Sequence, residues 1–135
     1  MSQAPVNDLV LDKDNKLVRA WRMWFSFADR VIQALQYTPT TVYSVPLTGF
    51  TIQAASNASK LVLNPAGVLA TGTVTMPATP QEGFEFRLSS TQVVTALTLT
   101  PGPGQTIKNA ATALAAGAGI CYTYASSTST WYRLY

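Results

Sequence analysis

Apolar residues between positions 17 and 36 recur at the spacing of one helix face. The intervals between them alternate between four and three residues, which is the pattern of a heptad seam. The seam consists of Leu17, Trp21, Trp24, Ala28, Val31 and Leu35, and Phe25 and Ile32 widen it on one flank. Pro39 cannot continue a helix, so the pattern predicts a helix over about 17–36 followed by a hinge.

From Thr41 onward the pattern changes to short runs rich in Val, Ile, Thr, Tyr and Phe, separated by turn signals such as Asn64–Gly67 and Pro101–Gly104. The expected strands are TVYSVPL, GFTIQA, KLVLN, VLATGTVTM, FEFRLS, VVTALTLT, QTIKN, GICYTYA and TWYRLY. A strand about every ten residues with turns between is typical of an antiparallel sandwich, jelly roll or small barrel. We see no internal repeat. The sequence therefore predicts a mainly β chain: an N-terminal docking and oligomerisation segment (1–39) and an antiparallel, jelly-roll-like β-sandwich (40–135).

A helix with so many aromatic side chains needs a partner surface to cover them. Each tryptophan can bury on the order of 200 Å², worth roughly 5 kcal/mol of transfer free energy before entropy is counted. One interpretation packs the helix onto its own β-domain. The narrow seam and the spacer-like YTPTT at 37–41 instead favour association with other copies or with a host surface. About three heptads are marginal for an isolated coiled coil, so the β-domain or that surface must contribute. We predict oligomerisation and docking through the seam and its flank, Leu17, Trp21, Trp24, Phe25, Ala28, Val31, Ile32 and Leu35.

The residues that most enzymes use are scarce. Histidine is absent, which removes Ser-His and Cys-His nucleophile pairs and the commonest metal ligand. Glu82 and Glu85 are the only acids after residue 40, and their pattern favours surface charges over a glycosidase pair. Cys121, the single cysteine, lies in an alternating apolar run typical of a buried thiol. We expect no enzymatic activity, no cofactor and no metal site.

Charge is sparse, at 11 % of the 135 residues with a formal net charge of +3. The Lys and Arg residues after position 40 are scattered singly, so we expect no nucleic-acid partner. No uninterrupted apolar run reaches about eighteen residues, and the polar, acidic start does not resemble a signal peptide; we expect no membrane partner and synthesis in a reducing cytosol.

Two stretches resemble small structural proteins of tailed-bacteriophage virions. LDKDNKLVRAWRMWF, residues 11–25, is similar to the opening of many such proteins, in which an Asp-rich turn precedes a helix with paired aromatics. Residues 61–135 resemble a β-domain that recurs at the C-terminus of phage head, neck and tail-fibre components. The matching features are LATGTVTMP, the P-x-x-P-x-x-G turn, the strand end LSST, the hairpin TLTPGPGQTI and the terminal TWYRL. The long fibrous repeat of full-length tail fibres is absent.

The resemblance implies a virion structural protein, assembled as a homotrimer and attached to the head or neck as a head fibre, decoration or cement protein. Its partners would be copies of itself and capsid, portal, adaptor or tail proteins. It would be synthesised in the cytoplasm of the host bacterium and located in the virion. The alternative is a tail-fibre or receptor-binding module for a host-surface glycan, in which Trp131, Tyr132 and Tyr135 stack on sugar rings. Against that alternative, Trp131, Tyr132 and Leu134 suit a last strand that closes the sandwich core.

Overall fold

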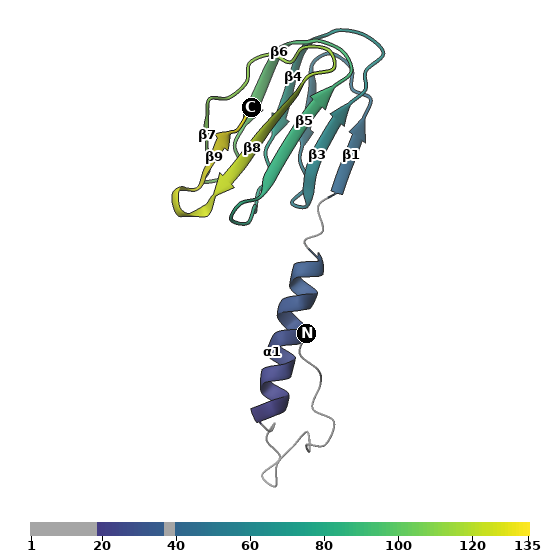
Figure 1. Ribbon diagram of the computed structural model, residues 1–135. Coiled ribbons are helices and arrows are strands. Elements are labelled where there is room, and N and C mark those ends of the chain that lie inside the picture. Colours follow the sequence, from purple (N-terminus) through teal and green to yellow (C-terminus); the bar gives the residue numbers. More distant parts are fainter. Residues whose placement is uncertain (1–18, 37–39) are drawn as a thin grey trace. The chain divides into compact units, whose positions relative to one another are not determined.

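The computed structural model describes residues 19–36, of which 33–36 in the backbone only, and residues 40–135 (Figure 1). The chain divides into two compact units, Met1–Thr38 and Pro39–Tyr135, which we call the helical unit and the β unit. In the helical unit, α1 spans Arg19–Gln36. The predicted helix is confirmed over that range, and its predicted first residue, Leu17, lies outside the described residues.

The β unit contains a strand at each of the runs that the alternating pattern marked. The strands are β1 (Thr40–Ser44), β2 (Phe50–Gln53), β3 (Ala58–Leu63), β4 (Leu69–Thr75), β5 (Glu85–Ser90), β6 (Val94–Thr100), β7 (Thr106–Lys108), β8 (Gly119–Ala125) and β9 (Thr130–Arg133). A short 3-10 turn, Ser126–Thr128, joins the last two. The positions of the strands were therefore predictable from the sequence.

The way the strands pair contradicts the predicted antiparallel sandwich. β1, β3 and β5 lie side by side and parallel in one sheet, and β2, β4 and β6 lie side by side and parallel in a second. The chain thus alternates between two sheets and forms a parallel β-solenoid of about three turns. Each turn carries the chain across to the opposite sheet, so consecutive strands never become hydrogen-bonded neighbours in these coils.

The coils differ in length, which explains why no repeat is visible in the sequence. In the first sheet the register advances by 19 residues from Thr41 to Lys60 and by 27 from Lys60 to Arg87. In the second sheet it advances by 22 residues from Phe50 to Gly72 and by 25 from Gly72 to Leu97. A solenoid without a fixed period leaves no self-similarity to detect.

The core lies between the two sheets, and Figure 1 shows β4 and β6 behind the larger one. On the inner face of the larger sheet, Cα partners run across the strands from Val42 to Leu61, Leu88 and Ile120. The last three are at most 4 % exposed, whereas Val42, on the first strand, is 39 % exposed. The smaller sheet contributes Val74, Leu97 and Leu99 to the same core. Burial therefore increases from the first coil inward.

The C-terminal strands close one end of the solenoid. β8 pairs antiparallel with β5, β9 pairs antiparallel with β8, and β7 pairs parallel with β9, which extends the larger sheet to six strands in the order β1-β3-β5-β8-β9-β7. Only this C-terminal part has the antiparallel pairing expected for the whole domain.

Candidate functional site

Three of the four aromatic side chains of α1 lie against one another on the helix surface. Trp21, Trp24 and Phe25 stand at positions i, i+3 and i+4, which neighbour each other on a helix surface. Their ring centroids are 5.3 to 5.9 Å apart, and Trp24 meets both of the others nearly edge to face. The cluster forms a compact, preformed aromatic surface.

The rest of the predicted seam continues this surface along α1. Ala28 is partly buried, while Val31 and Ile32 are 41 % and 53 % exposed, and Phe25 is 45 % exposed. Leu17 and the side chain of Leu35 lie outside the described residues. The six described members of the predicted site therefore share one helix, and half of them remain widely accessible to solvent.

Trp131 does not belong to any exposed surface, which corrects its assignment as a surface-binding residue. It is 0 % exposed and packs against Tyr124, with ring centroids 5.1 Å apart, and edge to face against Phe84 at 6.3 Å. Its indole N–H donates to Oε1 of Gln105 at 2.8 Å. The sequence pattern already suited Trp131 to a core position, whereas Tyr132 and Leu134, which it placed in the core as well, are exposed by 39 % and 53 %.

Gln105 holds this part of the core together. Besides accepting from Trp131, its Oε1 accepts from the backbone N–H of Gly102 at 3.1 Å, and its Nε2 donates to the carbonyls of Pro77 and Ala78 at 3.2 and 2.8 Å. One amide side chain therefore joins the turn after β4, the turn after β6 and strand β9. No pattern in the sequence indicates this role.

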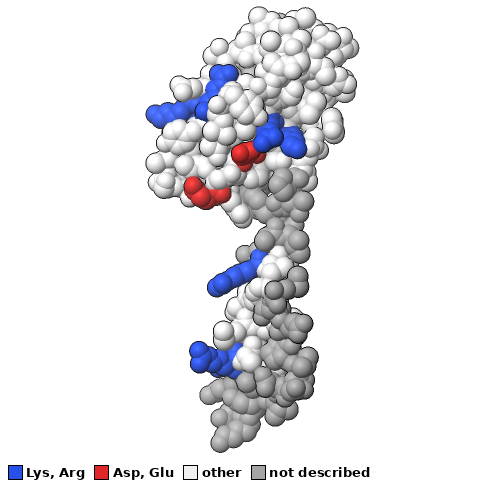
Figure 2. Space-filling view, in the orientation of Figure 1, with Lys and Arg blue, Asp and Glu red and all other residues white. Residues whose placement is uncertain are grey.

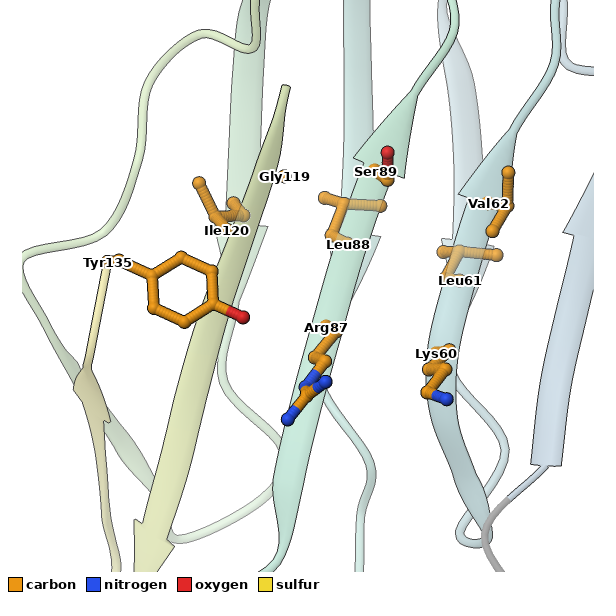
Figure 3. Close-up of a pocket in the computed structure, with 9 residues that line it drawn as sticks. All are labelled: Lys60, Leu61, Val62, Arg87, Leu88, Ser89, Gly119, Ile120 and Tyr135. Carbon is orange, nitrogen blue, oxygen red and sulfur yellow. The ribbon is translucent and has the colours of Figure 1, made fainter. Parts of the chain in front are cut away.

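Tyr132 and Tyr135, the other two predicted surface-binding residues, are exposed by 39 % and 60 %. Tyr135 lies beside a hollow of about 250 Å³ on the outer face of the larger sheet (Figure 3). The hollow is lined by residues of β3, β5 and β8 together with Tyr135. Its outward row is Val62, Ser89 and Gly119, which are Cα partners across the three strands. Because these side chains are small, the surface of the sheet is hollowed at this row.

Two cations stand next to the hollow. Lys60 and Arg87 are Cα partners on β3 and β5, and Figure 3 shows both side chains on the same side of the sheet as the Tyr135 ring. Arg87 donates to Glu85 at 2.7 Å, and this hydrogen bond is the main cause that raises the pKa of Arg87. Among the described residues, 19–36 and 40–135, no ion pair of Lys60 is found. In Figure 2 most of the visible face of the β unit carries no charge.

Both glutamates of the β unit have structural partners. Glu85 accepts the hydrogen bond from Arg87, as described above. Glu82 accepts from the hydroxyl and the backbone N–H of Ser126, each at 2.6 Å, and these bonds lower the pKa of its carboxyl. Glu82 therefore fastens the loop after β4 to the turn after β8.

The sulfur and oxygen ligands that a metal would need are not gathered in the described parts of the chain. No three Asp, Glu or Cys side chains come together within residues 19–36 and 40–135. Cys121 is a free thiol and 1 % exposed. Within the same residues, α1 is too polar to be a membrane-spanning helix.

Tyr122 anchors the loop that leads from β7 to β8. Its buried hydroxyl accepts from the backbone N–H of Ala111 at 2.8 Å and donates to the carbonyl of Asn109 at 3.1 Å. Burial is the largest cause that raises the pKa of this hydroxyl above its ordinary value. Asn109 has a positive φ of 55°, so the anchor also holds a backbone conformation that most residues avoid.

We expect Tyr122→Phe to lower the free energy of unfolding by about 1–3 kcal/mol, because the buried Ala111 N–H loses its acceptor. In the wild type, the contribution of the neutral hydroxyl is present below the unfolded tyrosine pKa of about 10 and is lost as pH rises through the raised folded pKa. Urea denaturation at neutral and at strongly alkaline pH measures both effects. The difference between wild type and variant should shrink at alkaline pH, and a constant difference would contradict this role.

The chain was compared with protein-family models and with curated proteins, and its fold with solved structures; none of the three comparisons gives a match. The features available for inferring a function are therefore the aromatic surface of α1, the hollow beside Tyr135 and the architecture of the solenoid.

Proposed function

We propose that this chain is a structural protein of a tailed-bacteriophage virion, assembled as a homotrimer and attached to the head or neck. It is synthesised in the host bacterial cytoplasm and works in the particle as a head fibre, decoration or cement protein. Its partners are copies of itself and neighbouring capsid, portal, adaptor or tail proteins. It has no enzymatic activity and needs no cofactor.

The observation that carries this proposal is the aromatic surface of α1. Three aromatic rings in mutual contact and a row of aliphatic side chains lie on a helix of 18 residues that belongs to a different compact unit from the solenoid. An isolated helix of this length is marginal in water, and most of its stability must come from packing its apolar face. Identical helices offer a partner with the same 3.5-residue spacing.

The β unit suits a rigid projecting part. It is densely hydrogen-bonded, its described buried side-chain N and O atoms all have partners, and its glutamates stabilise loops. Apart from the exposed apolar side chains between Val42 and Leu47, a sheet surface rich in Thr, Ser and Ala meets solvent or neighbours without large apolar patches. The motif resemblance to phage virion β-domains agrees with this role.

A second candidate function, a tail-fibre or receptor-binding module for glycans, is favoured by the hollow beside Tyr135. An exposed tyrosine ring gives a stacking face for a sugar, and Lys60 and Arg87 beside it suit an acidic sugar. Trp131 plays no part in such a site because it is buried. Binding of an acidic oligosaccharide that is lost in Tyr135→Ala would favour this function over a purely architectural one.

The deciding experiment is incorporation of a truncated chain, residues 40–135, into phage particles that lack the full-length copy. The truncation removes α1 and keeps all described strands. We expect a soluble, cooperatively folded β unit that fails to join particles, read by mass spectrometry of purified virions. Buried aromatic anchors typically contribute roughly 2 kcal/mol or more each to such an interface.

Two results would contradict the assignment of α1. Incorporation at full occupancy would make the β unit the anchor. Aggregation of the truncated chain would mean that α1 covers its own β unit. The matched control is the full-length chain carrying Ser26→Asp, which adds a charge to the helix face opposite the seam and should incorporate normally.

A further inference from the structure

The two ends of the solenoid are finished differently. At the C-terminal end, β8 covers the edge of β5, and the loop after β7 covers the edge of β6. In that loop, Leu114 exchanges two backbone hydrogen bonds with Val94 at 2.8 and 3.0 Å, and the Thr112 carbonyl accepts from Leu97 at 2.8 Å. At the other end, β1 and β2 are the edge strands of their sheets. The solenoid therefore has one closed end and one open end.

The open end exposes apolar side chains. Val42, Tyr43, Val45 and Leu47 are exposed by 39, 76, 74 and 82 %; we call these four residues the open-end patch. Val42 lies in the inward row of the larger sheet, yet it is far more exposed than its Cα partner Leu61 at 2 %. Leu61 has a strand on both sides and Val42 on one. The core is thus incomplete at this end of the β unit.

The open end also lacks the charges that usually protect an edge. No Lys, Arg, Asp or Glu occurs from residue 40 to residue 59. Free edge strands commonly carry a lysine or are very short, because a bare edge invites pairing with another chain. The opposite edge of the same sheet follows that rule, since β7 has three residues and ends in the exposed Lys108. End coils of solenoids need a polar cap for solubility, whereas residues 40–59, which form the first coil, carry no charged side chain.

The covalent connection to α1 indicates what covers the patch. α1 ends at Gln36 and β1 begins at Thr40, and four residue steps span at most about 14 Å. Helices that assemble through the seam must therefore hold the first coils of their β units close to one another. A second copy is the partner that this tether brings to every open end.

We propose that the open-end patch packs against the first coil of a neighbouring copy, so that each open end is closed by another molecule of the same protein. This inference rests on the homo-oligomer of the proposed function and adds a second interface to it. A short helix bundle is only marginally stable by itself. The added contact stabilises the oligomer, because the helix seam and the open-end patch bury apolar area in the same assembly step. It also hides the bare edges of β1 and β2 from other chains.

Site-specific cross-linking of the full-length chain tests the proposal. Tyr43→Cys places a thiol in the patch, and the matched control Lys108→Cys places one at the opposite edge of the same sheet. Both positions are exposed, so neither substitution threatens the fold, and the native Cys121 is too buried to react. With a short bis-maleimide reagent, which joins two thiols, we expect covalent dimers from Tyr43→Cys at a yield at least about tenfold above the control. We also expect Leu47→Asp to raise about tenfold the protein concentration at which the oligomer dissociates into monomers.

The possible outcomes separate this inference from the proposed function. An oligomer in which Tyr43→Cys cross-links no better than Lys108→Cys would overturn the closed-end contact and leave the helix-driven assembly standing. A cross-link to a different virion protein, and none between copies, would assign the patch to that protein and overturn the inference as well. A full-length chain that is monomeric in light scattering and in particles would overturn both.

Discussion

Replacing Trp131 by alanine should remove about 3–5 kcal/mol from the free energy of unfolding of the β unit. The side chain is fully buried, packs against Phe84 and Tyr124, and holds Gln105 through its indole N–H. Truncation leaves a large cavity and removes one of the two N–H groups that donate to the Gln105 amide oxygen. Since domains of this size are stable by roughly 5–15 kcal/mol, this loss is a large share of the total stability. Urea denaturation followed by circular dichroism gives the loss directly.

Tyr132→Ala is the matched control, because Tyr132 is the next residue of β9 and points to the solvent side. Tyr132→Ala should lower the free energy of unfolding by no more than about 0.5–1 kcal/mol. Trp131→Phe separates packing from hydrogen bonding: it keeps most of the ring contacts and removes the donor to Gln105. An equal loss from Tyr132→Ala and Trp131→Ala would contradict the placement of Trp131 in the core.

Trp24→Asp should reduce the solution mass of the protein from about three chains to one chain of 14.5 kDa. Trp24 lies within 6 Å of both Trp21 and Phe25 at the centre of the aromatic surface. A buried carboxylate there would have no partner in a bundle of identical helices, so its desolvation would outweigh the remaining contacts. Multi-angle light scattering at micromolar concentration measures the change.

The same charge placed elsewhere on α1 should leave the mass unchanged. Ser26 lies on the face opposite the seam and is exposed, with its hydroxyl donating to the Arg22 carbonyl at 3.0 Å. Ser26→Asp therefore controls for charge and for helix propensity. A wild type that is already monomeric, or a Ser26→Asp variant that dissociates as fully as Trp24→Asp, would count against the seam as the interface.

Strand positions could be predicted from the sequence because alternation is a local property of the chain. Phe86 and Leu88 face the core while Glu85 and Arg87 face solvent, as period two requires, and the turn residues mark where each run stops. The helix was predictable for the same reason. Its heptad spacing depends only on residues within one element.

Strand pairing could not be predicted, because the residues of a short strand do not determine whether its neighbour is parallel or antiparallel to it. The turn Asn64–Val68 reads like a hairpin connection, yet it carries the chain from β3 in one sheet to β4 in the other. Gly72 is a second example. Its place inside β4 has no local reason, but a Cβ there would lie 2.0 Å from Cε1 of Phe50, whose ring covers the glycine from the neighbouring strand.

For this protein, the sequence alone determined the helix with its aromatic face, the position of each strand, and the scarcity of charge and of catalytic side chains. Those features depend on residues within a few positions of one another. The tertiary structure alone decided the parallel winding, the role of Gln105 and the contrast between a closed and an open end. Each of these depends on which distant segments become neighbours, and the free energy that chooses among pairings comes from packing of the whole core rather than from any single run of residues.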